Sequence, residues 1–418
     1  MKKVLINAGE YPDKALGGKT TPPTTIDNIE YLLQRASVTA RYNVIKKRAE
    51  FRNASGEGVS DNEILNLAAV NQLGTHNVCA FALEVAQRNH FNPVEDWIRS
   101  KAWDEEDRLP SLYATVTAED GYPTSLKETL IHRWLLSAAA AALRPRGFRG
   151  RGVLTLQGAQ GIGKTSWGRA LISDKKLAAE VFKSDLHLDG SNKDSILTAI
   201  SHWLAEIGEL DSSFKKDVAR LKGFLTGDFD KIRAPYARTA MEHPRQTVFL
   251  ATVNEANFLV DTTGNSRWWT IPVQSLDFNH NIDMQQVFAQ LAAELEKEGC
   301  QWWLTADEEK ALEEQNRKHL SVSAIRERIL DRYEKADSGD RTGTYVTPME
   351  LLDRLGFKSV SNVQCKEAAA VLRELVGRSS RVQGRDRWRV KPRETEDFVT
   401  VPNTPRLVSM QYSDEEVF

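Results

Sequence analysis

The chain has 418 residues, of which 41% are hydrophobic and 27% charged, with a formal net charge of −2 and a pI near 6.5. This length exceeds one ordinary domain, and the composition is that of a globular chain with a sizeable core rather than of a disordered segment. The near-neutral charge excludes a protein that is held to nucleic acid by bulk positive charge, although it permits local basic tracks.

Cysteine spacing and hydropathy exclude further classes. Cys79, Cys300 and Cys365 form no CxxC pair, which argues against a disulfide framework and against a cysteine-based zinc site. The longest apolar run, 135–143, is far shorter than the ~20 residues that a membrane helix needs. The apolar stretch at the N-terminus is too short for a signal peptide. We therefore expect a cytoplasmic protein without a membrane partner.

The N-terminal region, residues 1–120, is expected to be mostly helical. Apolar residues follow helical spacing after Pro23, and the same spacing recurs over 64–73, 78–86 and 93–98. We find no catalytic constellation in this region.

From residue 121 the pattern changes to alternating helices and strands. A strong helical pattern covers 124–143, and short apolar runs of strand length follow at 152–157, 201–207 and 247–254. Such alternation predicts an α/β domain with a parallel sheet and crossover helices. We expect this domain to extend to residue 335, with helices over 284–298 and 307–330.

The strongest motif is the glycine-rich segment GAQGIGKT, which satisfies GxxxxGK[ST] between a predicted strand and a predicted helix. Its glycines allow backbone N–H groups to converge on phosphate oxygens, Lys164 can reach the β- and γ-phosphates, and the Thr165 hydroxyl can bind Mg²⁺. The segment therefore predicts a P-loop that binds ATP with Mg²⁺. The candidate nucleotide-binding residues are Gly158, Ala159, Gln160, Gly161, Ile162, Gly163, Lys164, Thr165 and Ser166.

A P-loop needs carboxylates to hold Mg²⁺ and to polarise the attacking water. Glu206 and Glu209 follow the apolar run WLAEIGELD and are the candidates. The usual pattern has adjacent acids, whereas these are separated by two residues. Thr165 and Glu206 are the candidate metal ligands. Which of the two acids holds the metal and which polarises water stays open. The alternative is that both acids belong to a solvated turn between a strand and a helix and have no role in binding.

Two further residues fit a hydrolytic site. Asn254 ends the apolar run TVFLATVN, where its amide could position the attacking water, although an Asn that only starts a turn would fit the same pattern. Arg267 precedes the pair Trp268 and Trp269. It could act as a finger that reaches the nucleotide of a neighbouring subunit, or it could form a surface ion pair.

Between Glu209 and Asn254 the chain alternates basic and aromatic residues, from Lys215 to Arg245. Cations combined with stacking rings are typical of single-stranded DNA binding. Charged, solvated helices are the alternative.

Taken together, the segments LQGAQGIGKTS, WLAEIGELD, FLATVNEANFL and TGNSRWW resemble the virulence-associated protein E family. The upstream segment FNPVEDWIRSKAWDEEDRL also resembles the region that precedes the ATPase core in this family, so the likeness covers about residues 25–275. Members of the family are AAA+ ATPases of the superfamily 3 helicase type, found in phages, prophages and pathogenicity islands.

The resemblance implies roles for individual residues. Glu206 and Glu209 become the Walker B acids, Asn254 becomes sensor 1, and Arg267 becomes the arginine finger of a hexamer. In similar helicases a loop before the sensor strand grips DNA, and Lys231 and Arg233 are the best matches here. The resemblance also implies a bacterial or phage-infected host cell and a separate primase as a possible partner, because residues 1–120 contain no primase-like carboxylate motif.

Residues 340–392 fit a small winged-helix-like domain, with helices over 348–355 and 363–376 and strands over 380–382 and 387–390. The last stretch, RVQGRDRWRVK, is basic, and Arg385, Arg387 and Arg389 are candidate contacts to duplex DNA. Docking of another protein is the alternative. Residues 393–418 have the composition of a flexible tail.

The sequence therefore predicts an α/β P-loop NTPase of the AAA+ type with a helical N-terminal region and a winged-helix-like C-terminal domain. The leading hypothesis is a hexameric, ATP-dependent DNA helicase that acts in replication of a phage or mobile element. The alternatives are an ATP-binding replication initiator without helicase activity and a P-loop kinase or signalling NTPase.

Overall fold

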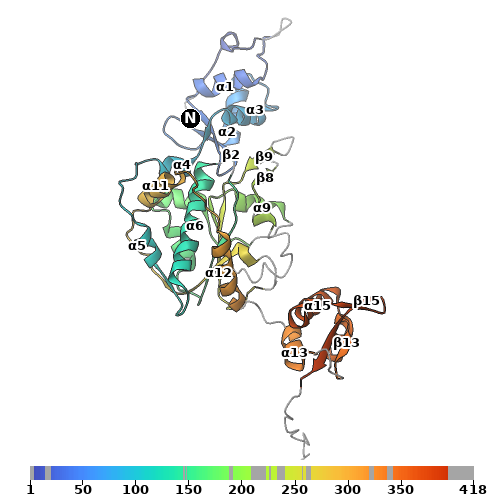
Figure 1. Ribbon diagram of the computed structural model, residues 1–418. Coiled ribbons are helices and arrows are strands. Elements are labelled where there is room, and N and C mark those ends of the chain that lie inside the picture. Colours follow the sequence, from blue (N-terminus) through green and yellow to red (C-terminus); the bar gives the residue numbers. More distant parts are fainter. Residues whose placement is uncertain are drawn as a thin grey trace, which may run out of the picture. The chain divides into compact units, whose positions relative to one another are not determined.

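The computed structural model describes residues 4–14, 20–144, 146, 148–187, 192–208, 223–225, 227–232, 241–256, 258–259, 265–319, 324–336 and 342–393. The chain divides into two compact units, residues 1–321 and 322–418, whose elements are labelled in Figure 1. Residues 1–120, which the sequence suggests as a separate region, belong to the same unit as the central sheet. Apart from Arg393, the predicted tail lies outside the described residues. No described helix is both long and apolar enough to span a bilayer.

The N-terminal part of the first unit contains a small sheet as well as helices. Its elements are η1 (Ala8–Glu10), α1 (Ile26–Arg35), α2 (Asp61–Val70), α3 (Val78–Gln87), β1 (Thr39–Asn43), β2 (Arg48–Arg52) and β3 (His90–Phe91). The three strands pair in the order β2-β1-β3. Helices make up most of the regular structure here, but the small sheet was not predicted. Its strands β1 (TARYN) and β2 (RAEFR) do alternate polar and apolar residues, which is the pattern of a strand with one buried face.

A six-stranded sheet forms the centre of the first unit, in the order β4-β11-β5-β10-β7-β6. Its strands are β4 (Val116–Ala118), β5 (Val153–Gln157), β6 (Phe182–Lys183), β7 (Leu204–Ile207), β10 (Val248–Val253) and β11 (Trp268–Leu276). All neighbours are parallel except β4, which is antiparallel to β11. The parallel α/β sheet and the strands expected at 152–157, 201–207 and 247–254 are confirmed.

Helices cover the sheet and connect its strands. They are α4 (Pro93–Ile98), α5 (Leu109–Ala114), α6 (Thr124–Leu143), α7 (Lys164–Ala170), α8 (Lys175–Val181), α9 (Lys193–Ile200), α11 (Met284–Leu295) and α12 (Ala306–Asn316). The charged helix expected over 307–330 is divided: α12 is followed by η3 (Arg317–His319), and α13 (Ala324–Arg332) belongs to the second unit.

The long helix α6 packs on one face of the central sheet and is seen in front of it in Figure 1. Its alanines 138–142 are fully buried, and their small side chains allow the helix backbone to come close to the strands. Trp134 of α6 donates its indole N–H to the carbonyl of Phe249 on β10 over 2.7 Å. Along β5 the apolar residues alternate, so that Leu154 faces the core under α6 and Val153 faces a second core on the other side.

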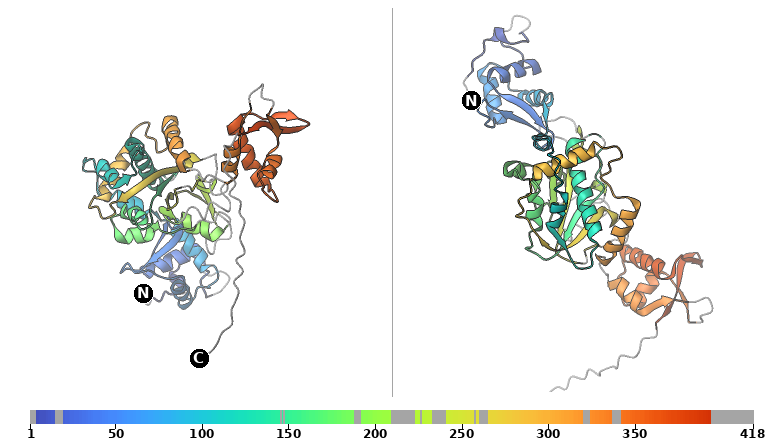
Figure 2. Two further views of the ribbon diagram at one scale, coloured as in Figure 1. Left: turned by 90° about the horizontal axis from the view of Figure 1, so that it is seen from below. Right: turned by 60° about the vertical axis from the view of Figure 1, so that its left-hand side comes forward.

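The second unit combines helices with a small antiparallel sheet, shown from two sides in Figure 2. Besides α13, its elements are β12 (Tyr333–Lys335), β13 (Thr344–Val346), α14 (Pro348–Arg354), α15 (Asn362–Val376), β14 (Ser380–Val382) and β15 (Arg385–Pro392). Strand β15 pairs with β12, β13 and β14. The helices and strands that the sequence predicts between residues 348 and 390 are confirmed.

The first unit also contains a hairpin of β8 (Phe229–Ile232) and β9 (Met241–Pro244), with a buried ion pair at its base. The guanidinium of Arg245 makes two hydrogen bonds to the carboxylate of Asp230, of 2.7 and 2.5 Å, and the two side chains are 2% and 4% exposed. The same guanidinium lies 4.6 Å from the ring centre of Phe224. This pair fixes the base of the hairpin.

Asp230→Ala should lower the free energy of unfolding by about 3–5 kcal/mol, because it leaves the Arg245 charge buried without a partner. The control is Glu242→Ala, which breaks an exposed pair with Lys231 on the same hairpin and should cost no more than about 1 kcal/mol. Urea denaturation of the three proteins measures both effects. Equal losses in the two variants would contradict a structural role for the buried pair.

Candidate nucleotide-binding site

The glycine-rich segment 158–165 forms the connection between β5 and α7, as the sequence predicts. Gly163 precedes α7 with φ of 92°, and a Cβ atom added there would lie 2.3 Å from the ring of Phe278. A Cβ atom added at Gly158 would lie 2.4 Å from the carbonyl oxygen of Val273. Because both positions exclude any side chain, the backbone of the loop can run close to β11 and to the segment that follows it.

Lys164 lies in the first turn of α7 and is 7% exposed. Its ammonium donates to the carbonyls of Gly158 and Ala159 over 2.7 and 2.8 Å, and to Oδ1 of Asn254 over 2.9 Å. Burial lowers the pKa of Lys164, and the nearby carboxylate of Glu206 partly opposes this effect. The glycine-rich loop thus surrounds a buried ammonium group whose present partners are neutral oxygens.

Glu206 of β7 is a buried carboxylate, 1% exposed, with hydrogen bonds to both oxygens. Oε1 accepts from the hydroxyls of Thr165 and Thr252 over 2.7 and 2.8 Å, and Oε2 accepts from the backbone N–H of Asp185 over 2.9 Å. Thr165 and Glu206, predicted as metal ligands, therefore lie side by side. A carboxylate and a hydroxyl are the oxygen ligands that Mg²⁺ prefers.

Strand order explains why these residues meet. Strand β10 lies between β5 and β7, and the carboxyl ends of the three parallel strands share one edge of the sheet. Asn254, directly after β10, contacts Lys164, and Thr252 on the same strand contacts Glu206. Thr252 was not among the predicted residues, although its spacing of two from Asn254 places both on one face of an extended segment. Glu209 lies outside the described residues.

Arg267 lies at the opposite edge of the sheet. It ends η2 (Asn265–Arg267) and directly precedes β11, which runs parallel to β5 with Trp268 beside Val153. The glycine-rich loop leaves the other end of β5, and Val153 is five residues before Gly158. Trp268, which follows Arg267, is therefore roughly 16 Å from the loop along the strand direction, at about 3.3 Å per residue. Asn316 of α12 fixes this corner by donating to the carbonyl of Trp268 over 2.9 Å. Arg267 is therefore placed away from the loop of its own chain.

Arg267 also has an unsatisfied donor. Its Nε atom is buried and has no hydrogen-bond partner among the residues that the structure describes. The ion pair that the sequence left open as an alternative role for Arg267 is not seen within that part of the chain.

Of the two predicted DNA contacts in the first unit, Lys231 lies on the β8–β9 hairpin. Lys231 of β8 is 69% exposed, and its ammonium is 3.9 Å from the carboxylate of Glu242 on β9. Arg233 lies outside the described residues.

The three predicted arginines of the second unit differ in their surroundings. Arg385 is exposed at the start of β15. Arg387 is largely buried, 3.2 Å from the carboxylate of Glu350, and donates to the carbonyl of Tyr345 over 3.3 Å. The guanidinium of Arg389 is 6.0 Å from the ring centre of Tyr345. Glu350 thus already compensates one of the three charges.

Comparison with known proteins places this arrangement in a family. The sequence model of the virulence-associated protein E-like domain matches residues 98–321, more than half of the chain and the whole of the site around Lys164 and Glu206. The chain belongs to this family. The resemblance stated from the motifs is thereby confirmed.

Some solved structures resemble this virulence-associated protein E-like chain more distantly. Two of them are titled "The apo structure of NrS-1 C terminal region (305-718)" and "The A form apo structure of NrS-1 C terminal region-CTR", with 12% and 13% sequence identity and TM-scores of 0.37 and 0.38. Each alignment covers 87% of this chain and 98% of the other. None of the curated proteins that were compared matches the chain.

Thr252→Val should lower the free energy of unfolding of the virulence-associated protein E-like unit by about 1.5–3 kcal/mol, because it removes a donor to a buried charged oxygen. Thr155→Val on the neighbouring strand β5 is the matched control. It removes a bond to the neutral carbonyl of Val153 and should cost about 0.5–1.5 kcal/mol. Chemical denaturation distinguishes the two, and equal losses would argue against Glu206 as the charged centre of this cluster.

Proposed function

We propose that this protein is an ATP-dependent DNA translocase of the superfamily 3 helicase type, which acts as a hexamer in the replication of a phage or other mobile element. The observation that carries this proposal is the meeting of Lys164, Asn254, Thr165 and Glu206 at one edge of a parallel sheet, beside a glycine-rich loop. Membership of the virulence-associated protein E-like family supports it, because the motif resemblance to that family implies an AAA+ ATPase.

In this proposal the loop holds the phosphates of ATP. Its backbone N–H groups bind phosphate oxygens, and Lys164 exchanges its contacts with the carbonyls of Gly158 and Ala159 for the β- and γ-phosphates. The exchange is favourable because phosphate offers the buried ammonium an opposite charge in place of neutral oxygens.

Thr165 and Glu206 would hold Mg²⁺, whose charge would offset negative charge on the phosphate oxygens. The contact between them favours Glu206 as the acid on the metal side. This leaves Glu209 to polarise the attacking water and to accept its proton. Asn254, already beside Lys164, orients the water so that its oxygen bonds to the γ-phosphorus while the bond to the ADP oxygen breaks.

Arg267 completes the site of a neighbouring copy. Its place at the opposite edge of the sheet keeps it from the loop of its own chain, and its buried Nε atom has no partner among the described residues. A guanidinium supplied in trans would stabilise the charge on the transferred phosphoryl group. Hydrolysis would then depend on assembly, as a ring-shaped motor requires.

DNA contacts are proposed through Lys231 on the β8–β9 hairpin, through Arg233, and through Arg385 and Arg389 of the second unit. A near-neutral chain with a few placed cations can release DNA in each cycle. Arg387 pairs with Glu350, which reduces its availability to DNA.

Lys164→Ala should abolish DNA-stimulated ATP hydrolysis, with a loss of about 10²–10³-fold in turnover, because the variant lacks the cation that faces the transferred phosphate. The control is Lys176→Ala, which removes an exposed lysine of α8 and should retain wild-type turnover. Turnover is measured with and without single-stranded DNA.

Turnover that is indifferent to DNA, in a protein that stays monomeric at all concentrations, would contradict the translocase. ATP binding without turnover would instead favour an initiator whose nucleotide only stabilises assembly.

A further inference from the structure

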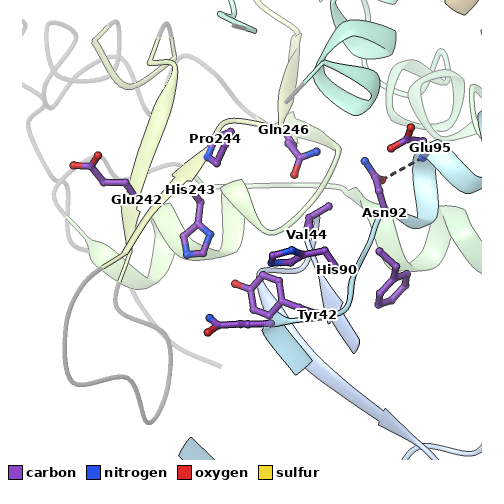
Figure 3. Close-up of a pocket in the computed structure, with 11 residues that line it drawn as sticks. Tyr42, Val44, His90, Asn92, Glu95, Glu242, His243, Pro244 and Gln246 are labelled. Carbon is purple, nitrogen blue, oxygen red and sulfur yellow. Dashed lines mark hydrogen bonds between the residues drawn. The ribbon is translucent and has the colours of Figure 1, made fainter. Parts of the chain in front are cut away.

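A cavity lies in the first unit, away from the glycine-rich loop. It has a volume of about 540 Å³ and is lined on one side by the N-terminal sheet and the start of α4, and on the other side by β9 and the residues after it. Figure 3 shows the rings of Tyr42, His90 and His243 gathered at this cavity, with Gln246 between His243 and Asn92. The proposed nucleotide site uses none of these residues.

The cavity offers flat rings to a ligand. The ring of Tyr42 is nearly parallel to that of His243, with centres 6.2 Å apart and 11° between the planes, and it meets His90 edge-on at 5.4 Å. Phe91 adds a fourth ring, with the guanidinium of Arg41 3.9 Å from its centre. Such walls suit a planar heteroaromatic group.

Two polar side chains in the lining are available to read the edge of such a ring. The hydroxyl of Tyr42 is buried without a hydrogen-bond partner in the described structure, and burial raises its pKa to about 12, so that it remains a donor. The Gln246 side chain is 4% exposed. A glutamine amide supplies one donor side and one acceptor, the pair that complements the edge of a nucleobase.

The charges around the cavity differ between its lining and its surroundings. None of the described lining residues is a lysine or an arginine, and the two carboxylates in the lining, Glu95 and Glu242, repel anions. Cations lie just behind the lining instead: Arg99 is 3.0 Å from Glu95, and Lys231 is 3.9 Å from Glu242. This distribution favours a ligand with a neutral ring inside and anionic groups outside.

The wall formed by β9 is held in place by the Arg245–Asp230 pair described above. Burial lowers the pKa of His243, so that its ring is neutral near pH 7 and can stack and hydrogen-bond without carrying a charge. The β9 wall of the cavity is therefore fixed in position. Strand β9 also pairs with β8, which carries the proposed DNA contact Lys231.

We infer that this cavity, between Tyr42 and His90 of the N-terminal sheet and His243 and Gln246 of the β9 wall, binds one unpaired nucleobase of single-stranded DNA. The inference rests on the proposed function for the identity of the polymer. The base stacks on the rings, the amide of Gln246 and the hydroxyl of Tyr42 bond to its edge, and the flanking phosphates lie near Arg41, Arg99 and Lys231.

The test uses a single-stranded oligonucleotide with one 2-aminopurine, titrated with the full-length protein in the absence of ATP. Fluorescence should be quenched as the base enters the cavity, and His243→Ala and Gln246→Ala should each weaken binding about tenfold, because each removes a stacking or edge contact. His76→Ala, which removes an exposed histidine that does not line the cavity, is the matched control and should bind as wild type. Thermal unfolding confirms that each variant is folded.

Photo-cross-linking gives a second measurement on the unmodified protein. A strand with one 5-iodouracil should cross-link to peptides that contain Tyr42, Phe91 or His243. Unchanged affinity in both cavity variants, or cross-links only to other peptides, would overturn the inference. Displacement of the strand by free deoxynucleoside at equal affinity would also overturn it, since the cavity would then serve a small molecule.

ATP hydrolysis by the wild-type protein is measured separately, without DNA. If the base does not bind in the cavity but hydrolysis is normal, only the cavity inference is refuted and the proposed ATPase stands. Absence of hydrolysis with normal base capture refutes the ATPase alone.

Discussion

The arrangement of the central sheet depends on one buried carboxylate. Glu206 carries its charge within the fully buried strand β7, where an uncompensated charge would be strongly unfavourable. Three donors from three separate segments satisfy it: Thr165 from α7, Thr252 from β10 and the N–H of Asp185 after β6. A shift of any of these segments would leave the charge without a partner, so the carboxylate specifies their mutual positions.

The same constraint prepares the chemistry that we propose. Because Glu206 binds the Thr165 hydroxyl, the first turn of α7 is held against β7, and Lys164 in that turn is held against Asn254, directly after β10. The side chains that would meet phosphate and Mg²⁺ are positioned before either is bound. Pre-organisation of this kind removes reorganisation from the reaction step.

Sequence reasoning succeeded where a local pattern and a global rule agreed. The apolar runs that became β5, β7 and β10 are bounded by polar residues, and the shared edge of a parallel sheet brings Lys164, Glu206 and Asn254 together. It missed β1 and β2, although both alternate polar and apolar residues and Ala40, Ala49 and Phe51 pack on the N-terminal core. It also missed the N–H of Asp185, because a backbone donor leaves no trace in residue type, and the cavity at Tyr42, because its walls come from segments about 200 residues apart.

In the proposed hexamer, each ATP site combines Lys164 from one chain with Arg267 from another. This arrangement is tested most directly by mixing two inactive variants, Lys164→Ala and Arg267→Ala, and measuring ATP hydrolysis in the presence of single-stranded DNA. In a mixed assembly, an Arg267→Ala subunit keeps its own Lys164 and receives Arg267 from its Lys164→Ala neighbour. If the site is shared between subunits, mixing restores ATP hydrolysis that neither variant shows alone. Hydrolysis that stays absent at every mixing ratio, although the variants are shown to co-assemble, would contradict it.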